Sequence, residues 1–319
     1  MSANSPLVQA RSLRFRVLHG QGPLIALLLL VLANLVLTKN FYASNNLWNI
    51  LLQITPTTLV AVGMTFVIAT GGIDLSVGSL MAIASAVAAT NLGHGTGFAI
   101  LLGMSVAAAI GTANGALIAG LRIQPIIITL AVLIAGRGIA QVISNGGELI
   151  PIDNASFEEL GRGRLGGIPV QVIVATLVAV AAAVILRRTV LGRHILAVGG
   201  NEKAAALSGV NVWATKIIVY GMSGALAGLA GLIEGARLGA SDAAKVGLNI
   251  ELDAIAAVVV GGTLIEGGTA TIFGTIVGAL IMQVITTSLN MLLIPYEWSL
   301  VVKGAVMLVV MYSQRSRAE

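Results

Sequence analysis

Long apolar segments alternate with short polar or glycine-rich segments along almost the whole chain. A helix needs about 20 mostly apolar residues to cross a bilayer. Ten segments approach or reach that length, and they cover residues 23–37, 49–70, 75–92, 97–120, 125–143, 168–186, 215–235, 252–265, 272–292 and 298–313. The pattern predicts an all-α polytopic membrane protein with about ten transmembrane helices, organised as a single transmembrane domain over residues 1–319.

Two of these segments are interrupted by glycines. Residues 71–78 read Gly-Gly-Ile-Asp-Leu-Ser-Val-Gly, and residues 252–265 are short and run into Gly261-Gly262. A break leaves backbone groups that lipid cannot satisfy, so it must lie against protein or a watery cavity. Such broken helices are typical of transport pathways. For most of the other glycines, close helix packing is the simpler interpretation.

A weak internal sequence repeat predicts two pseudo-repeated halves. The pattern Gly-x-x-x-Gly-Ala-Leu begins at Gly111 and again at Gly274, and a glycine-rich segment with an acid precedes each copy. The acids are Asp74 and Asp253. The spacing of the glycines lets helix backbones approach closely, and it is also common by chance in glycine-rich helices.

The composition excludes most soluble classes of protein. Apolar residues make up 57% of the chain and charged residues 10%, with a mean hydropathy of +0.97. Soluble domains have roughly 25% charged residues, so a soluble enzyme, a nucleic-acid binder and a secreted domain are all excluded. The chain has no cysteine, and its three histidines are far apart. We therefore expect no metal site in this chain.

The basic residues predict the topology. With a cytoplasmic N-terminal tail at 1–22, eleven Lys and Arg residues fall in cytoplasmic segments and five in outer loops. This distribution follows the positive-inside rule. It places the loop 187–214 and the C-terminal tail 314–319 in the cytoplasm, and the loop 144–167 outside.

Polar residues at membrane depth are candidates for a solute pathway. Two of them have a specific structural alternative: Arg137 could form an interior ion pair or snorkel to the outer interface, and Asp253 with Glu251 could complement a helix dipole that Asn249 could cap. The set has more amides and hydroxyls than charges, which favours a neutral hydrogen-bonding solute over an ion. The candidates are Asp74, Ser76, Asn114, Gln124, Arg137, Asp253 and Asn290.

The loop 187–214 contains the signature of a short helix. Asn201 is a natural N-cap, Glu202 suits the first turn, alanines follow, and Gly209 ends the segment. A helix this short is marginal alone, so it is either a docking element or a plain connector. The candidate docking residues are Gly200, Asn201, Glu202, Ala205, Ser208 and Gly209.

Three motifs in order resemble those of ABC-transporter permeases for monosaccharides, of the ribose and galactofuranose types. They are the segment 71–78, the loop from Gly200 to Gly209, and the segment from Glu251 to Thr263. The resemblance covers about residues 24–312. The stretches 123–125 and 136–141 look closest to the galactofuranose type.

The resemblance implies a permease subunit of an importer in a bacterial inner membrane, surrounded by lipid. Its partners would be a second permease chain, identical or sister, together with cytoplasmic ATP-binding subunits and a periplasmic sugar-binding protein. The ATPase would bind ATP and Mg²⁺, and this chain would hold no cofactor. The helix 201–209 would be the coupling helix, whose Asn201, Glu202 and Ser208 meet the ATPase.

Two other functions are weighed against this one. An ion-coupled secondary transporter of a small polar solute would use intramembrane acids such as Asp74 for coupling. An intramembrane enzyme is disfavoured because the chain lacks cysteine, clustered histidines and a His-Glu-x-x-His motif. The chain also lacks a phosphate-binding Gly-x-x-x-x-Gly-Lys-Ser/Thr loop, so it is not itself the ATPase.

Overall fold

The computed structural model describes residues 22–315, which form thirteen α-helices and short connecting elements. The predicted tails 1–22 and 314–319 lie almost entirely outside these residues. In chain order the helices are α2 (Gly22–Leu37), α3 (Ser44–Ala69), α4 (Val77–Thr90), the 3₁₀ turn η1 (Leu92–His94), α5 (Thr96–Leu121), α6 (Pro125–Ile143), α7 (Ala155–Arg162), α8 (Val170–Arg188), α9 (Val190–Gly200), α10 (Glu202–Leu207), α11 (Val212–Leu238), α12 (Ile250–Val260), α13 (Ile272–Met291) and α14 (Tyr296–Arg315).

Each of the ten predicted apolar segments overlaps one helix. Six of these helices are long and apolar enough to cross a membrane, namely α3, α5, α6, α8, α11 and α13. The others are shorter or more polar, so the polytopic fold is supported and the number of ten crossings stays a prediction. The pseudo-repeat of two halves also stays a prediction.

The described residues include two small pieces of sheet beside the helices. Strands β1 (Ile150–Pro151) and β4 (Ala240–Ser241) pair antiparallel, with Ile150 opposite Ser241. Strands β2 (Arg164–Leu165) and β3 (Ile168–Pro169) form a hairpin. Both pieces lie in connections between the long helices, so the helices alone form the core.

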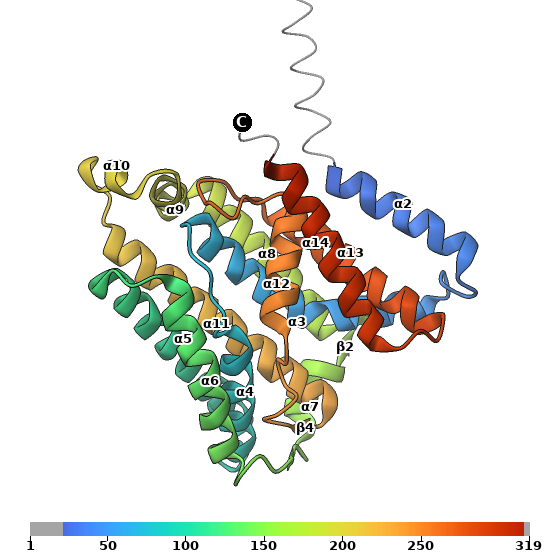
Figure 1. Ribbon diagram of the computed structural model, residues 1–319. Coiled ribbons are helices and arrows are strands. Elements are labelled where there is room, and N and C mark those ends of the chain that lie inside the picture. The colour runs from blue at the N-terminus through green and yellow to red at the C-terminus, as the bar shows by residue number, and fades with distance from the viewer. Residues whose placement is uncertain (1–21, 316–319) are drawn as a thin grey trace, which may run out of the picture.

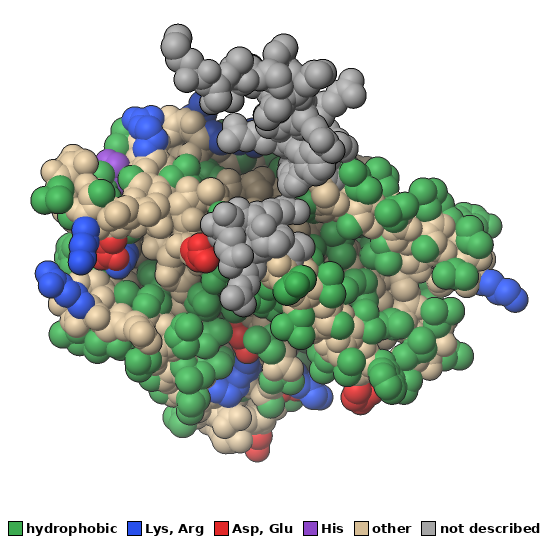
Figure 2. Space-filling model, turned by 45° about the horizontal axis from the view of Figure 1, so that its top comes forward, with side chains coloured by type: hydrophobic (Ala, Val, Ile, Leu, Met, Phe, Trp, Pro, Cys, Tyr) green, Lys and Arg blue, Asp and Glu red, His purple; other side chains and the backbone are tan. Residues whose placement is uncertain are grey.

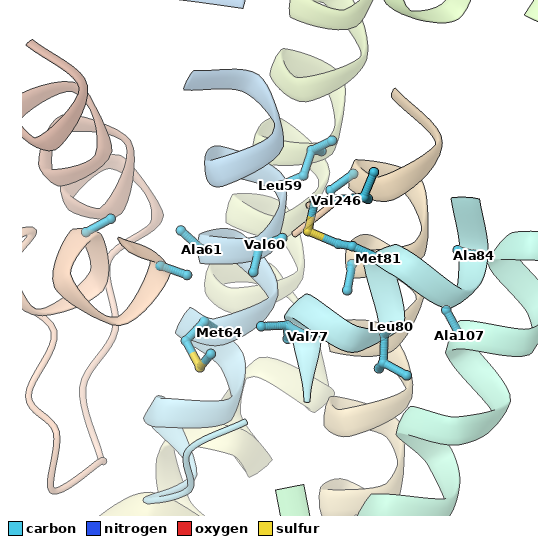
Figure 3. Packing of buried hydrophobic residues seen from close by; sticks show 14 of the residues in the cluster. Leu59, Val60, Ala61, Met64, Val77, Leu80, Met81, Ala84, Ala107 and Val246 are labelled. Atoms are coloured by element: carbon cyan, nitrogen blue, oxygen red, sulfur yellow. The ribbon is translucent and has the colours of Figure 1, made fainter. Parts of the chain in front are cut away.

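The core lies where α3, α4, α5 and α11 meet. Figure 3 shows Leu59 and Met64 of α3 close to Val77 and Met81 of α4. Across α4, Ala107 of α5 joins the same cluster. Apolar side chains that fill this volume without gaps hold the helices in one arrangement, because protein interiors are close-packed.

Both copies of the Gly-x-x-x-Gly pattern are sites of close helix packing. A Cβ on Gly111 would collide with the carbonyl oxygen of Tyr220 on α11. In the second copy, a Cβ on Gly278 would collide with the carbonyl oxygen of Ala257 on α12. The packing interpretation of these glycines is therefore confirmed.

The outer surface of the helix bundle is strongly apolar. Large side chains such as Ile134 of α6, Leu177 of α8 and Leu308 of α14 are each more than 60% exposed. Figure 2 shows hydrophobic side chains over much of the visible face, with the charged side chains in small groups. A continuous apolar exterior suits lipid, because monomeric soluble proteins rarely expose such patches.

The two ends of the molecule differ in what they contain. The start of α2, the end of α14 and the helix α10 lie at one end, whereas α7 and β4 lie at the other (Figure 1). The predicted topology likewise groups the loop 187–214 with both tails and places the loop 144–167 opposite. Which of the two ends faces the cytoplasm stays a prediction.

Candidate functional site

The break between α3 and α4 is closed by a buried carboxylate. Oδ1 of Asp74 accepts hydrogen bonds from the backbone nitrogen of Ser76 at 3.1 Å and from its hydroxyl at 2.5 Å. Oδ2 accepts from the hydroxyl of Ser223 on α11 at 2.8 Å. The amide nitrogen of Asn114 on α5 donates to the Ser76 hydroxyl at 3.0 Å. We call these four residues the Asp74 cluster.

The Asp74 cluster ties a broken segment to two long helices. Asp74, Ser76, Ser223 and Asn114 are at most 1% exposed. Three of them were predicted pathway residues, and the structure brings these three together. Their polar groups bond to each other within the buried interior, so the cluster positions the break. Ser223 was missed, because a single serine in a long apolar helix carries no distinguishing pattern.

The Arg137 side chain binds backbone carbonyls of a loop rather than a carboxylate. Its guanidinium donates to the carbonyl oxygens of Ala243 at 3.0 Å, Val246 at 2.7 Å and Gly247 at 3.3 Å. These carbonyls belong to the segment between β4 and α12. Of its two structural explanations, the ion pair is not formed among the described residues, because the guanidinium bonds to backbone groups and attaches α6 to the segment before α12. A role of Arg137 in solute passage stays a prediction.

Asp253 forms an ion pair between α12 and α14. Nζ of Lys303 on α14 lies 2.9 Å from Oδ1 and 3.1 Å from Oδ2 of Asp253 on α12. Glu251 and Asp253 both stand in the first turn of α12, as their dipole interpretation requires. Asn249 occupies the N-cap position of α12 as predicted, but with φ of 61° its side chain accepts no hydrogen bond from a backbone nitrogen. Its left-handed backbone turns the chain into the helix instead.

The remaining two predicted pathway residues lie apart from the Asp74 cluster. Gln124 is exposed at the position before α6, where its side chain makes no capping bond. Asn290 is exposed in the last turn of α13. A role for either in solute passage stays a prediction.

The loop 187–214 folds into two helices. The predicted short helix is α10, and the Asn201 side chain accepts from the nitrogen of Ala204 at 2.9 Å as an N-cap. Gly209 follows with φ of 84°, a conformation that suits glycine. The helix α9, which precedes α10, was not predicted, because its short apolar stretch resembles the end of the preceding span.

The polar groups predicted to face the ATPase are exposed and have hydrogen-bond partners within the chain, and their contact with an ATPase stays a prediction. Oε2 of Glu202 lies 2.8 Å from Nζ of Lys216 on α11. The Ser208 hydroxyl donates to the carbonyl of Ala204, and Ala205 is buried. The most prominent side chain of α10 is instead Leu207, which is 91% exposed. Sequence reasoning missed Leu207 because an apolar residue in an Ala-rich helix does not look like a contact.

Three glycines connect this loop to the break after α3. A Cβ on Gly199 of α9 would collide with the carbonyl oxygen of Ala69, the last residue of α3. The same carbonyl accepts a hydrogen bond from the nitrogen of Gly268 at 3.0 Å. A Cβ on Gly267 would lie 2.8 Å from the nitrogen of Gly71. The end of α9 therefore touches the backbone only a few residues from Asp74.

Comparison with known proteins gives consistent relatives over most of the chain. The ribose import permease protein RbsC of Escherichia coli K12 is 44% identical over 91% of this chain and 92% of its own length. RbsC of Bacillus subtilis is 40% identical over 95% of this chain and 94% of its own length. The galactofuranose transporter permease protein YtfT of Escherichia coli K12 is 39% identical over 95% of this chain and 92% of its own length. These values do not single out the galactofuranose type.

A family model described as "Branched-chain amino acid transport system / permease component" matches residues 46–311. The comparison with solved structures gives no match. The matched range runs from α3 to α14 and includes the Asp74 cluster, both Gly-x-x-x-Gly sites and the loop with α9 and α10. The chain belongs to this family of membrane transport permeases.

Proposed function

We propose that the chain is the transmembrane permease subunit of an ATP-binding-cassette importer, which carries a monosaccharide across the bacterial inner membrane by alternating access. The observation that carries the proposal is the 44% identity with a ribose import permease over 91% of the chain. Relatives named for galactofuranose, L-arabinose and fructose widen the solute class to pentoses and hexoses.

The partners follow from what this chain lacks. Its sequence has no phosphate-binding loop, so a cytoplasmic ATP-binding subunit would hold ATP and Mg²⁺ and supply the energy. The connection between α6 and α8 contains only β1, α7, β2 and β3, which is too small for a sugar-binding domain. A periplasmic binding protein would deliver the sugar, and a second permease chain, identical or sister, would complete the pathway.

The loop with α9 and α10 is suited to couple the ATPase to the pathway. In this proposal α10 docks on the ATPase through Leu207, and movement of α10 shifts α9. Because Gly199 of α9 contacts Ala69, the shift reaches the break that holds Asp74. Direct contacts join α9 to the end of α3, and the loop would couple the two sites if nucleotide binding and solute passage each favour a different position of α9.

Reconstitution tests the function. The chain is purified from its native membrane with its associated proteins, placed in lipid vesicles, and assayed for uptake of radiolabelled ribose, arabinose and fructose. We expect an ATP-binding subunit to co-purify and uptake to require hydrolysable ATP. Uptake by the chain alone under a proton or sodium gradient would instead identify an ion-coupled secondary transporter.

Leu207→Asp is expected to weaken association with the ATPase strongly. Apolar side chains that are exposed alone on a short helix gain stability only when a partner covers them, and a buried large side chain contributes about 1.5–3 kcal/mol. Placing a carboxylate there would add a desolvation cost. The measurement is the yield of ATPase that co-purifies with the permease, which should fall by roughly tenfold or more.

The matched control is Leu165→Asp. Leu165 lies in β2 and is 70% exposed, so the substitution is the same but stands in the loop predicted to lie outside. It should leave the yield of ATPase unchanged. Normal recovery of the ATPase with Leu207→Asp would show that α10 is a connector.

A further inference from the structure

Two glutamines meet near the middle of two long helices. Nε2 of Gln283 on α13 donates to Oε1 of Gln53 on α3 at 2.8 Å and to the hydroxyl of Thr287 at 3.2 Å. Figure 1 shows α3 and α13 crossing in the same part of the molecule, next to α14. The pair thus joins segments that are 230 positions apart in the sequence.

This amide pair is accessible, unlike the Asp74 cluster. Gln53 is exposed and Gln283 is partly exposed. Among the described residues, Nε2 of Gln53 and Oε1 of Gln283 have no hydrogen-bond partner. An amide group without a hydrogen-bond partner that faced acyl chains would cost several kcal/mol, since lipid offers no hydrogen bonds. The surface around the pair therefore faces water or a polar molecule rather than lipid.

The pair belongs to a neutral polar strip. Asn49 lies one turn before Gln53 on α3 and is exposed, while Thr287 and Asn290 follow Gln283 toward the end of α13. Neither α3 nor α13 contains a charged residue. Amides both donate and accept hydrogen bonds, as sugar hydroxyls do, whereas an ion would require charges or several convergent oxygen ligands.

An apolar groove reaches α13 one turn from Gln283, and neither Gln53 nor Gln283 is among its lining residues. It has a volume of about 400 Å³ and lies between α3, α8 and α13. Leu280, one of its lining residues, stands one turn before Gln283 on the same face of α13. The hydroxyls of Thr55 and Thr176 in this groove bond back to their own helices. Small-molecule sites combine such apolar walls with a few fixed polar groups.

We propose that Gln53 and Gln283 form a solute-contact site in the translocation pathway, where their free amide groups hydrogen-bond the hydroxyls of a neutral sugar as it crosses. The proposal rests on the proposed function and deepens it, since it places one contact of the pathway on α3 and α13. Small polar groups that hold the sugar only weakly also allow it to leave, as conduction requires.

The test uses the complete transporter with its ATPase and binding protein in lipid vesicles. The double variant Gln53→Leu/Gln283→Leu keeps the side-chain size and removes every amide hydrogen bond. We expect it to assemble and to hydrolyse ATP in response to the binding protein. Uptake of radiolabelled ribose, arabinose or fructose should fall about tenfold, because two hydrogen bonds to the passing sugar are lost. Each single variant should lie between the double variant and the wild type.

Thr112→Val is the control. Thr112 is an exposed polar residue of α5 whose hydroxyl bonds to Ala108 of its own helix, so its loss should leave uptake unchanged. Wild-type uptake by the double variant would overturn the contact site and leave the proposed function intact. Loss of the second permease chain or of the ATPase from the double variant would overturn it too, since the pair would then be an assembly contact. Failure of the wild-type complex to import any of the three sugars would overturn the proposed function and with it the contact site.

Discussion

For an Asp74→Ala variant, we expect the rate of sugar uptake to fall more than about tenfold and the amount of folded permease in the membrane to decrease. The substitution removes both oxygens that accept from Ser76 and Ser223, and all three donors are buried. Each buried donor without an acceptor costs about 1–3 kcal/mol. The break after α3 would lose its attachment to α11, so both the fold and the position of the pathway would suffer. Uptake and the amount of folded permease in the membrane are the measurements.

Asp74→Asn separates the structural role from ion coupling. An asparagine keeps one oxygen for Ser76, and the Ser223 hydroxyl can rotate to accept from its amide nitrogen. Uptake should therefore recover most of the wild-type rate. A proton- or sodium-coupled transporter that used this carboxylate would lose activity equally with Asn and Ala. Asp153→Ala, in the exposed connection before α7, is the control and should transport normally.

The sequence predicts the helices well because their signal is local. Apolar length alone places all ten segments on helices, and the capping residues Asn201 and Gly209 place α10 to within about two residues. The acid in the break after α3 also stands out, because carboxylates are rare at membrane depth. These features can be recognised without knowledge of the tertiary contacts.

What the sequence misses depends on contacts between distant segments. Ser223 lies 149 positions from Asp74, and nothing near it marks it as a partner. From the sequence alone, Arg137 could bind a carboxylate, solvent or backbone carbonyls. The packing of α6 beside the segment 243–247 determines that it binds backbone carbonyls. Likewise, the ion pair of Glu202 with Lys216 depends on the path of α11 and has no local signal in the sequence, while contact of Glu202 with a partner protein stays a prediction.

Glycines show most clearly that contacts between distant segments cannot be read from the local sequence. Of the neighbouring glycines 199 and 200, a Cβ on the first would collide with two other segments, whereas a Cβ on the second would meet nothing within 4 Å. Both look alike in the sequence, as parts of the same Gly-Gly pair. The difference arises because α9 ends against the last turn of α3 and the loop 267–268.

Gly199→Ala is accordingly expected to uncouple ATP hydrolysis from sugar uptake. The added Cβ would collide with the carbonyl oxygen of Ala69 and would lie 2.5 Å from the nitrogen of Gly268, so α9 must move away from both. The substitution leaves the exposed side chain of Leu207 in place, so the ATPase should still bind even where α9 and α10 shift together. The number of sugars imported per ATP hydrolysed should fall by about tenfold, because movement of the loop no longer reaches the break beside Asp74.

The ratio of sugar to ATP is the decisive quantity because it distinguishes a lost connection from a lost partner. Leu207→Asp should lower uptake and permease-stimulated hydrolysis together, whereas Gly199→Ala should lower uptake and leave hydrolysis close to normal. Gly138→Ala adds the same methyl group to α6, where nothing lies within 4 Å, and should keep the wild-type ratio. An unchanged ratio with Gly199→Ala would show that the contact between α9 and α3 only packs the fold, and the route from the ATPase to the pathway would have to pass through α11 instead.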